Sequence, residues 1–165
     1  MLDVREFAYK RLDAAKETFQ RKRVLAPVGY LLHRDGVDIY EFDWSSKDAR
    51  RKSMKAFKRN ARIQKAVATI TINECEFYAF PPWKNEKPVA KTRETPEWLR
   101  KAIAKGSGRC ISMDIEVPGQ PAVSVMVAYS TTESGGVRFE KPEEGPVDFN
   151  GPAPPKSREE EGPPN

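Results

Sequence analysis

The fold is set by the stretch VLAPVGYLLHRDGVDIYEFDW, residues 24–44. Two apolar runs flank Arg34-Asp35-Gly36, and an Asp-Gly pair between such runs is a strong hairpin signal, because glycine readily adopts the positive φ that tight turns need. We therefore predict two antiparallel strands, at 27–33 and 37–43. An antiparallel sheet is the expected centre of the fold.

The segment before this hairpin is expected to form an amphipathic helix over residues 4–21. Apolar residues recur there at spacings of three and four, which places them on one face of a helix. Asp3 and Glu6 are positioned as a capping box at its N-terminus. The apolar face of this helix needs a partner surface, which the sheet supplies.

The segments after the hairpin predict further strands. VATITINECEFYAF, residues 67–80, is rich in β-branched and aromatic residues and predicts a long strand that two prolines end. Residues 109–117 and 122–130 alternate apolar and polar side chains on either side of a Pro-Gly turn, which predicts a second hairpin. Residues 137–140 are expected to add a short edge strand.

Two more helices are expected. Ser45 and Ser46 are candidate N-caps for a helix that runs to about Lys65, with Asp48 placed to complete a capping box with Ser45. A third, short helix is predicted over 95–106, where Thr-Pro-Glu opens it and a glycine closes it. The loop before it, residues 80–95, is long enough to be functional.

Together these elements predict an α+β protein with the order α-β-β-α-β-α-β-β. The sheet is expected to be largely antiparallel, with five or six strands, and the three helices are expected to pack on one of its faces.

The domain organisation follows from length and composition. A chain of 165 residues suits one domain, and we assign residues 1–140 to it. Residues 141–165 hold seven prolines and little apolar surface, so we expect a disordered Pro/Glu-rich tail there. The chain has neither a signal-peptide pattern nor a long apolar run, so we expect a soluble, cytoplasmic protein.

The positive charge is concentrated between residues 46 and 65. This stretch, SKDARRKSMKAFKRNARIQK, holds nine Lys or Arg residues and one acid, whereas the whole chain carries a formal charge of +5. On the expected helix, Met54 and Ala61 lie on the same side as Phe57 and form a narrow apolar face. The opposite side is almost wholly cationic and comprises Lys47, Arg51, Lys55, Lys58, Arg59, Arg62 and Lys65.

This cationic side favours an anionic partner. Like charges three or four residues apart each cost roughly 0.2–0.5 kcal/mol of helix stability, which a purely structural surface would avoid by alternating signs. The two partner hypotheses are nucleic-acid phosphates and an acidic protein surface, and the third interpretation is a merely solvated face. A membrane is disfavoured because Met54 and Phe57, the only large apolar anchors, are needed by the core.

The loop at 80–95 is expected to add to a nucleic-acid site. Trp83 is a candidate for stacking on an unpaired base, and Lys84 beside it for a phosphate contact. The alternative for Trp83 is that it pins its loop to the domain. Further cations of the loop with the same expected role are Lys87, Lys91 and Arg93.

Enzyme signals are weak. His33, the only histidine, abuts the Asp-Gly turn and has no second histidine to share a metal. Glu74 and Glu76 alternate with Cys75 and so share one face of their strand, which leaves a metal-dependent hydrolase or nuclease as an alternative, although the wet face of the sheet is the simpler explanation. Cys75 and Cys110 are expected to be free thiols.

No catalytic, cofactor or metal-binding motif is present, so the expected function is that of a non-enzymatic accessory or binding protein. The nearest alternative is a protein–protein adaptor or a subunit of a larger assembly, which would use the basic helix and the tail.

The succession of GYLLHRDGVDIYEFDW, a helix, a strand ending INECEFYAF, a proline-containing loop, ETPEWLRKA and a final hairpin resembles small uncharacterised α+β proteins of bacterial and phage genomes. The resemblance spans about residues 25–140. In those proteins the middle strand often ends in an S-E-A-W-like run, from which Asn73-Glu74-Cys75-Glu76 departs. Because that family has no established activity, the resemblance implies the fold and no function.

Overall fold

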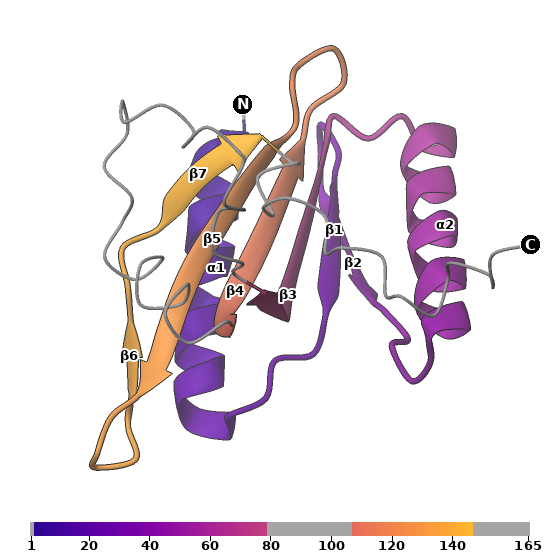
Figure 1. The fold of residues 1–165 in the computed structure, drawn as a ribbon. Helices are drawn as coiled ribbons and strands as arrows, with labels where there is room; N and C mark the ends of the chain where they lie inside the picture. Colours follow the sequence, from indigo (N-terminus) through magenta and orange to yellow (C-terminus); the bar gives the residue numbers. More distant parts are fainter. Residues whose placement is uncertain (1, 79–106, 147–165) are drawn as a thin grey trace, which may run out of the picture.

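The computed structural model describes residues 2–78 and 107–146 (Figure 1). These residues form an α+β fold in which one antiparallel sheet carries both helices of the described part. The predicted fold class and the predicted antiparallel sheet are therefore confirmed. The expected loop at 80–95 and the expected third helix at 95–106 lie outside the described residues.

Within the described residues the sheet has seven strands, where five or six were predicted for the chain. They are β1 (Val28–Leu32), β2 (Val37–Glu41), β3 (Ala68–Tyr78), β4 (Ser107–Glu116), β5 (Val123–Thr131), β6 (Val137–Phe139) and β7 (Glu143–Pro146). Their order across the sheet is β2-β1-β3-β4-β5-β6, and β7 also pairs with β5. Both predicted hairpins are present, since β1 pairs with β2 and β4 pairs with β5.

The additional strand, β7, lies in the segment that the sequence assigned to a tail. Its residues, EEGP, have no apolar alternation, so no pattern predicted a strand there. It pairs with the first half of β5 through backbone hydrogen bonds, while the Glu144 carboxylate accepts hydrogen bonds from Arg5 and from the Tyr9 hydroxyl. The sheet therefore continues past residue 140, the expected end of the domain.

The first helix, α1 (Val4–Lys22), has the predicted start and ends one residue later than predicted. Of the predicted capping box, the Asp3 cap is confirmed, whereas the Glu6 carboxylate pairs with Lys10 at 2.6 Å. The Asp3 carboxylate accepts hydrogen bonds from the backbone N–H groups of Arg5 and Glu6, which caps the helix. Its stripe of Ala8, Leu12, Ala15 and Phe19 is buried against one face of the sheet. The sheet residues of this core include Leu32, Ile70, Ile72, Ile111, Met113, Val125 and Val127.

The second helix, α2 (Lys47–Ile63), begins after its N-cap Ser46, whose hydroxyl accepts a hydrogen bond from the Ala49 N–H. The expected capping box with Ser45 does not form, because the Ser45 hydroxyl donates instead to the Asp43 carboxylate, 2.6 Å away. Of the two candidate caps, the second one, Ser46, therefore caps the helix.

The two helices lie on opposite faces of the sheet, which corrects the expectation that all helices share one face. Leu32 packs in the core under α1, whereas its neighbour Leu31 packs with Phe57 of α2. Successive residues of a strand point to opposite faces, so Leu31 and Leu32 assign one face to each helix. Figure 1 shows α2 beside the β1–β2 end of the sheet, away from α1.

Candidate functional site

The position of α2 is fixed by one aromatic side chain. Phe57 is the only buried residue of α2 and is 2% exposed. Its ring meets those of Tyr40 and Phe42 edge to face, with centroids 5.5 and 5.1 Å away. It lies over Gly29 of β1, where an added Cβ would stand 2.7 Å from a Phe57 ring carbon. Because Phe57 points to the sheet, the opposite side of α2 faces outward.

That outward side is cationic, as the helical arrangement predicted. We call it the basic face and define it as Lys47, Arg51, Lys55, Lys58, Arg59, Arg62 and Lys65. Every one of these side chains is exposed. The predicted α2 residues are therefore brought together on one accessible surface.

Few acids neutralise the basic face. Arg51 pairs with Asp48 at 3.2 Å, and Lys58 pairs with Glu116 of β4 at 3.8 Å. The other basic-face residues form no ion pair with any residue of the described part of the chain. Within residues 2–78 and 107–146, most of the charge of the basic face is thus not neutralised.

Helix electrostatics explain only part of this charge. A cation in the last turn, such as Arg62, is favoured by the helix dipole. Lys47 is the first residue of α2, where the dipole disfavours a cation, and it has no ion pair within the described residues. Helix electrostatics therefore do not account for Lys47.

Arg50 faces away from this surface. Its guanidinium stacks over the Trp44 ring at 4.2 Å from the centroid, which is a typical cation–π distance. Trp44 and Arg50 line a small cavity of about 100 Å³ with Met54 and Phe42. Arg50 therefore packs the start of α2 on the segment that leads into it from β2, and it is not part of the basic face.

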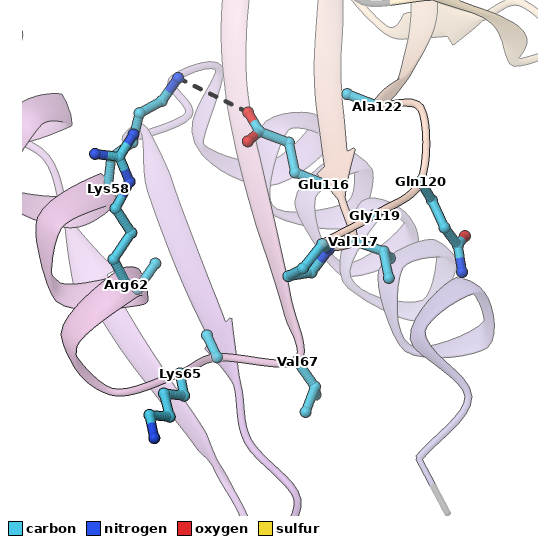
Figure 2. Close-up of a pocket in the computed structure, with 12 residues that line it drawn as sticks. Lys58, Arg62, Lys65, Val67, Glu116, Val117, Gly119, Gln120 and Ala122 are labelled. Carbon is cyan, nitrogen blue, oxygen red and sulfur yellow. Dashed lines mark ion pairs between the residues drawn. The ribbon is translucent and has the colours of Figure 1, made fainter.

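A cleft of about 850 Å³ lies between the end of α2 and the turn that joins β4 to β5. Figure 2 shows Lys58 extending across it toward Glu116, with Gln120 on the far wall. Lys58, Arg62 and Lys65 of the basic face line one side. The other lining residues are Ala61, Ala66, Val67, Glu116, Val117, Pro118, Gly119, Gln120 and Ala122. The cleft thus extends the basic face into a concave surface with polar groups on both sides.

Sequence reasoning missed the second wall of this cleft. Glu116 and Gln120 carry no local signal of a site. They reach α2 because Glu116 pairs with Thr69. Thr69 is the second residue of β3, which follows α2 after a link of only four residues, 64–67. Only the strand register, which is not readable from local pattern, brings them to the helix.

Neutralising Glu116 should strengthen anion binding. In Glu116→Gln the competing carboxylate is lost and Lys58 is released, while the side-chain shape is kept. Because both groups are about half exposed, at 56% and 49%, we expect only about a threefold gain in affinity for an oligonucleotide, measured by fluorescence anisotropy. Glu133→Gln, an exposed carboxylate on the β5–β6 turn, is the control and should change little. Unchanged or weaker binding by Glu116→Gln would place the anion outside the cleft.

Lys65 adopts a backbone conformation that favours glycine. Its φ is 51°, in the left-handed region. The Lys65 N–H donates to the Arg62 carbonyl at 3.2 Å and the Ala66 N–H to the Ala61 carbonyl at 2.9 Å, which together form a Schellman motif. Lys65 thus occupies the position after the C-terminus of α2 at which glycine is the preferred residue.

Lys65→Gly should therefore raise the stability of the protein and lower its affinity for an anion. We expect the free energy of unfolding to rise by roughly 1 kcal/mol, because glycine relieves the left-handed strain, while affinity for a polyanion falls through loss of one cation. Urea denaturation and anisotropy measure the two quantities. A variant that is both less stable and unchanged in binding would contradict the role given to Lys65.

The two carboxylates considered for a metal-dependent enzyme, those of Glu74 and Glu76, lie on β3 and not on the basic face. Glu74 pairs with Ile111 across β3 and β4, so it lies on the face covered by α1 and not on the expected wet face. Its carboxylate accepts a hydrogen bond from the Tyr129 hydroxyl, and burial together with this bond raises the pKa of Tyr129. Tyr129 in turn packs on Phe19 of α1, at 4.6 Å between centroids. Glu74 is therefore engaged in holding α1 against the sheet.

Other candidate chemistry is limited in the described residues. His33 lies 3.2 Å from the Asp38 carboxylate, a local contact beside the first hairpin turn. Within residues 2–78 and 107–146, no three His, Cys, Asp or Glu side chains gather to hold a metal ion. Trp83 and Lys84, with the other cations of the 80–95 loop, lie outside the described residues, so their predicted roles stay predictions.

Neither described helix combines the length and the apolar character that crossing a membrane requires. Comparison with protein-family models, curated proteins and solved structures finds no match for this chain.

Proposed function

We propose that this is a non-enzymatic accessory or binding protein, and that the basic face of α2 and the adjoining cleft bind the phosphates of a nucleic acid. The observation that carries this proposal is a row of exposed cations, Lys47, Arg51, Lys55 and Arg59, placed where neither ion pairs nor the helix dipole accounts for all of them.

The spacing of this row suits a repeating anion. Its members are four residues apart, and a helix rises about 1.5 Å per residue, so the charges recur about every 6 Å along the axis. A phosphate backbone presents negative charge in a regular series of the same kind. The regular spacing of the four cations therefore favours a polymer of phosphates, and not a single acidic group, as the ligand.

The same surface is less suited to an acidic protein. Protein interfaces are centred on buried aromatic or Arg anchors in apolar pockets. The basic face contains no aromatic residue, because the aromatic ring of α2, Phe57, packs against the sheet. Its arginines are exposed on a helix surface and do not lie in an apolar pocket. Phosphate contacts need no such anchor.

Binding of this kind is independent of base sequence. Lysine and arginine contacts to phosphates fix position and carry no base information. The expected behaviour is weak affinity at physiological salt, with similar values for unrelated sequences. Comparison of single-stranded with double-stranded DNA and RNA identifies the form that fits the cleft.

The test is a fluorescence-anisotropy titration of the protein against labelled single- and double-stranded DNA and RNA at several salt concentrations. We expect the logarithm of the association constant to fall linearly with the logarithm of salt, with a slope that counts the phosphates neutralised. Absence of binding at the lowest salt overturns the proposal. If a labelled poly-glutamate peptide binds under those conditions while nucleic acid does not, the adaptor alternative replaces it.

A further inference from the structure

Cys75 and Cys110 face each other across the centre of the sheet. They are direct partners in the antiparallel pairing of β3 with β4, although 35 positions separate them in the sequence. Their Sγ atoms lie 3.0 Å apart, and both are thiols. A disulfide bond is about 2.05 Å long, so an approach of about 1 Å would join them.

The two thiols differ in access and in acidity. Cys110 is buried at 0% exposure, whereas Cys75 is partly exposed. The hydrogen bond from the Cys110 thiol lowers the pKa of Cys75, and the same contact and burial raise the pKa of Cys110. The thiolate is the reactive form of cysteine. Cys75 is therefore suited to attack a reagent from solution, and Cys110 to resolve the product.

We propose that Cys75 and Cys110 form an oxidisable thiol pair that closes to an intramolecular disulfide by exchange with a small-molecule disulfide of the glutathione class. The proposal is independent of nucleic-acid binding, because it rests on the strand register, the sulfur geometry and the exposure of the two thiols, and not on the basic face.

The chemistry is two successive thiol–disulfide exchanges. The Cys75 thiolate attacks one sulfur of oxidised glutathione, which forms a mixed disulfide at Cys75 and expels one glutathione thiolate. The Cys110 sulfur then attacks the Cys75 sulfur, which breaks the mixed disulfide and releases the second glutathione. Two electrons pass from the pair to glutathione disulfide, and the two thiol protons end on the two glutathione molecules.

The product would join β3 and β4 covalently. The sequence between the two cysteines, residues 76–109, would become a closed loop, and that loop contains Trp83 and Lys84. A cross-link stabilises a protein mainly by restricting its unfolded chain. We expect the melting temperature of the oxidised protein to rise by roughly 10 °C.

The experiment incubates the reduced full chain with glutathione redox buffers, quenches with an alkylating agent and measures intact mass. We expect wild type to lose the mass of two hydrogens, to carry no glutathione and to resist alkylation at both cysteines. The equilibrium constant for oxidation should be about 30-fold or more larger in native buffer than in urea, where the thiols meet only by chance.

Single variants test the assigned order of attack. Cys110→Ser should accumulate one glutathione, located at Cys75 by peptide mapping, because no resolving thiol remains. Cys75→Ser should gain none, because Cys110 is buried. The proposal is overturned if wild type keeps free thiols or a stable glutathione adduct, if the disulfide links two chains, or if native and urea constants are equal. That last comparison uses wild type only and does not depend on the folding of the variants.

Discussion

Replacing Arg51, Lys55, Lys58 and Arg62 together by Gln is expected to lower the affinity for nucleic acid by about 1000-fold at roughly 0.1 M monovalent salt. Each phosphate contact contributes about 0.7–0.9 to the slope of log affinity against log salt, because a neutralised phosphate releases condensed counterions. Four lost contacts reduce that slope by about 3, which at 0.1 M salt corresponds to about three decades. The two proteins should therefore converge in affinity as the salt approaches roughly 1 M.

The matched control removes the same charge elsewhere. Arg21, Arg34, Arg138 and Lys141 are exposed and lie outside α2, so their joint replacement by Gln gives the same net charge. We expect the control to lose less than about tenfold, through long-range attraction only. Equal losses in both variants would show that net charge, and not the basic face, governs binding.

Unfolding does not explain the expected loss. Glutamine is a good helix former, and the substitutions remove repulsion between Arg51 and Lys55 and between Lys58 and Arg62, pairs at four-residue spacing. The same substitutions remove the ion pairs of Arg51 with Asp48 and of Lys58 with Glu116, which offsets part of this gain. The variant should therefore be about as helical as wild type by circular dichroism. Weak binding by a fully helical variant assigns the loss to the removed charges.

Local rules predicted the elements that carry the site. The bounds of α1, β1 and α2 agree with expectation to within two residues, because caps and apolar periodicity act over a few positions. The same periodicity placed Phe57 toward the core and Lys55 and Arg62 away from it. Local sequence therefore specified the basic face before any tertiary contact was known.

The placement of α1 and α2 on opposite faces of the sheet was not predicted, although the sequence of β1 contains a signal for it. Val28-Gly29-Tyr30-Leu31-Leu32 has apolar side chains on both faces of β1, a pattern typical of a strand covered on both sides. The consecutive leucines indicate two helical layers, one for Leu32 under α1 and one for Leu31 under α2. Gly29 is a third sign of the layer that contains α2, because a residue without a side chain leaves room for the Phe57 ring.

Two features had no readable signal because they arise from pairing between distant residues. β7 is held by backbone pairing with β5 and by the contacts of Glu144 with Arg5 and Tyr9 of α1, which lie more than 130 positions away in the sequence. The contact between Cys75 and Cys110 requires the register of β3 against β4, and a shift of one residue would send the two side chains to opposite faces. Such pairings cannot be deduced from propensity or periodicity.

Truncating the residue that holds α2 should have the largest effect on stability. Phe57→Ala is expected to lower the free energy of unfolding by about 3–5 kcal/mol, the usual cost of deleting a buried phenylalanine side chain. The edge-to-face contacts with Tyr40 and Phe42 would be lost with the ring, and no other residue of α2 is buried. Urea denaturation measures the change, and the melting temperature should fall by about 10 °C.

The control and a double-mutant cycle make this prediction specific. Ile63→Ala removes an apolar side chain of α2 that is 65% exposed, and should cost no more than about 0.5 kcal/mol. Gly29→Ala should be destabilising by itself, because its Cβ would stand 2.6 Å from a Phe42 ring carbon and 2.7 Å from one of Phe57. Once Phe57 is alanine, one of these clashes is gone, so the two substitutions together should cost about 1 kcal/mol less than their sum. Strict additivity, or a cost below about 1 kcal/mol for Phe57→Ala, would mean that another contact fixes α2 and sets the direction of its basic face.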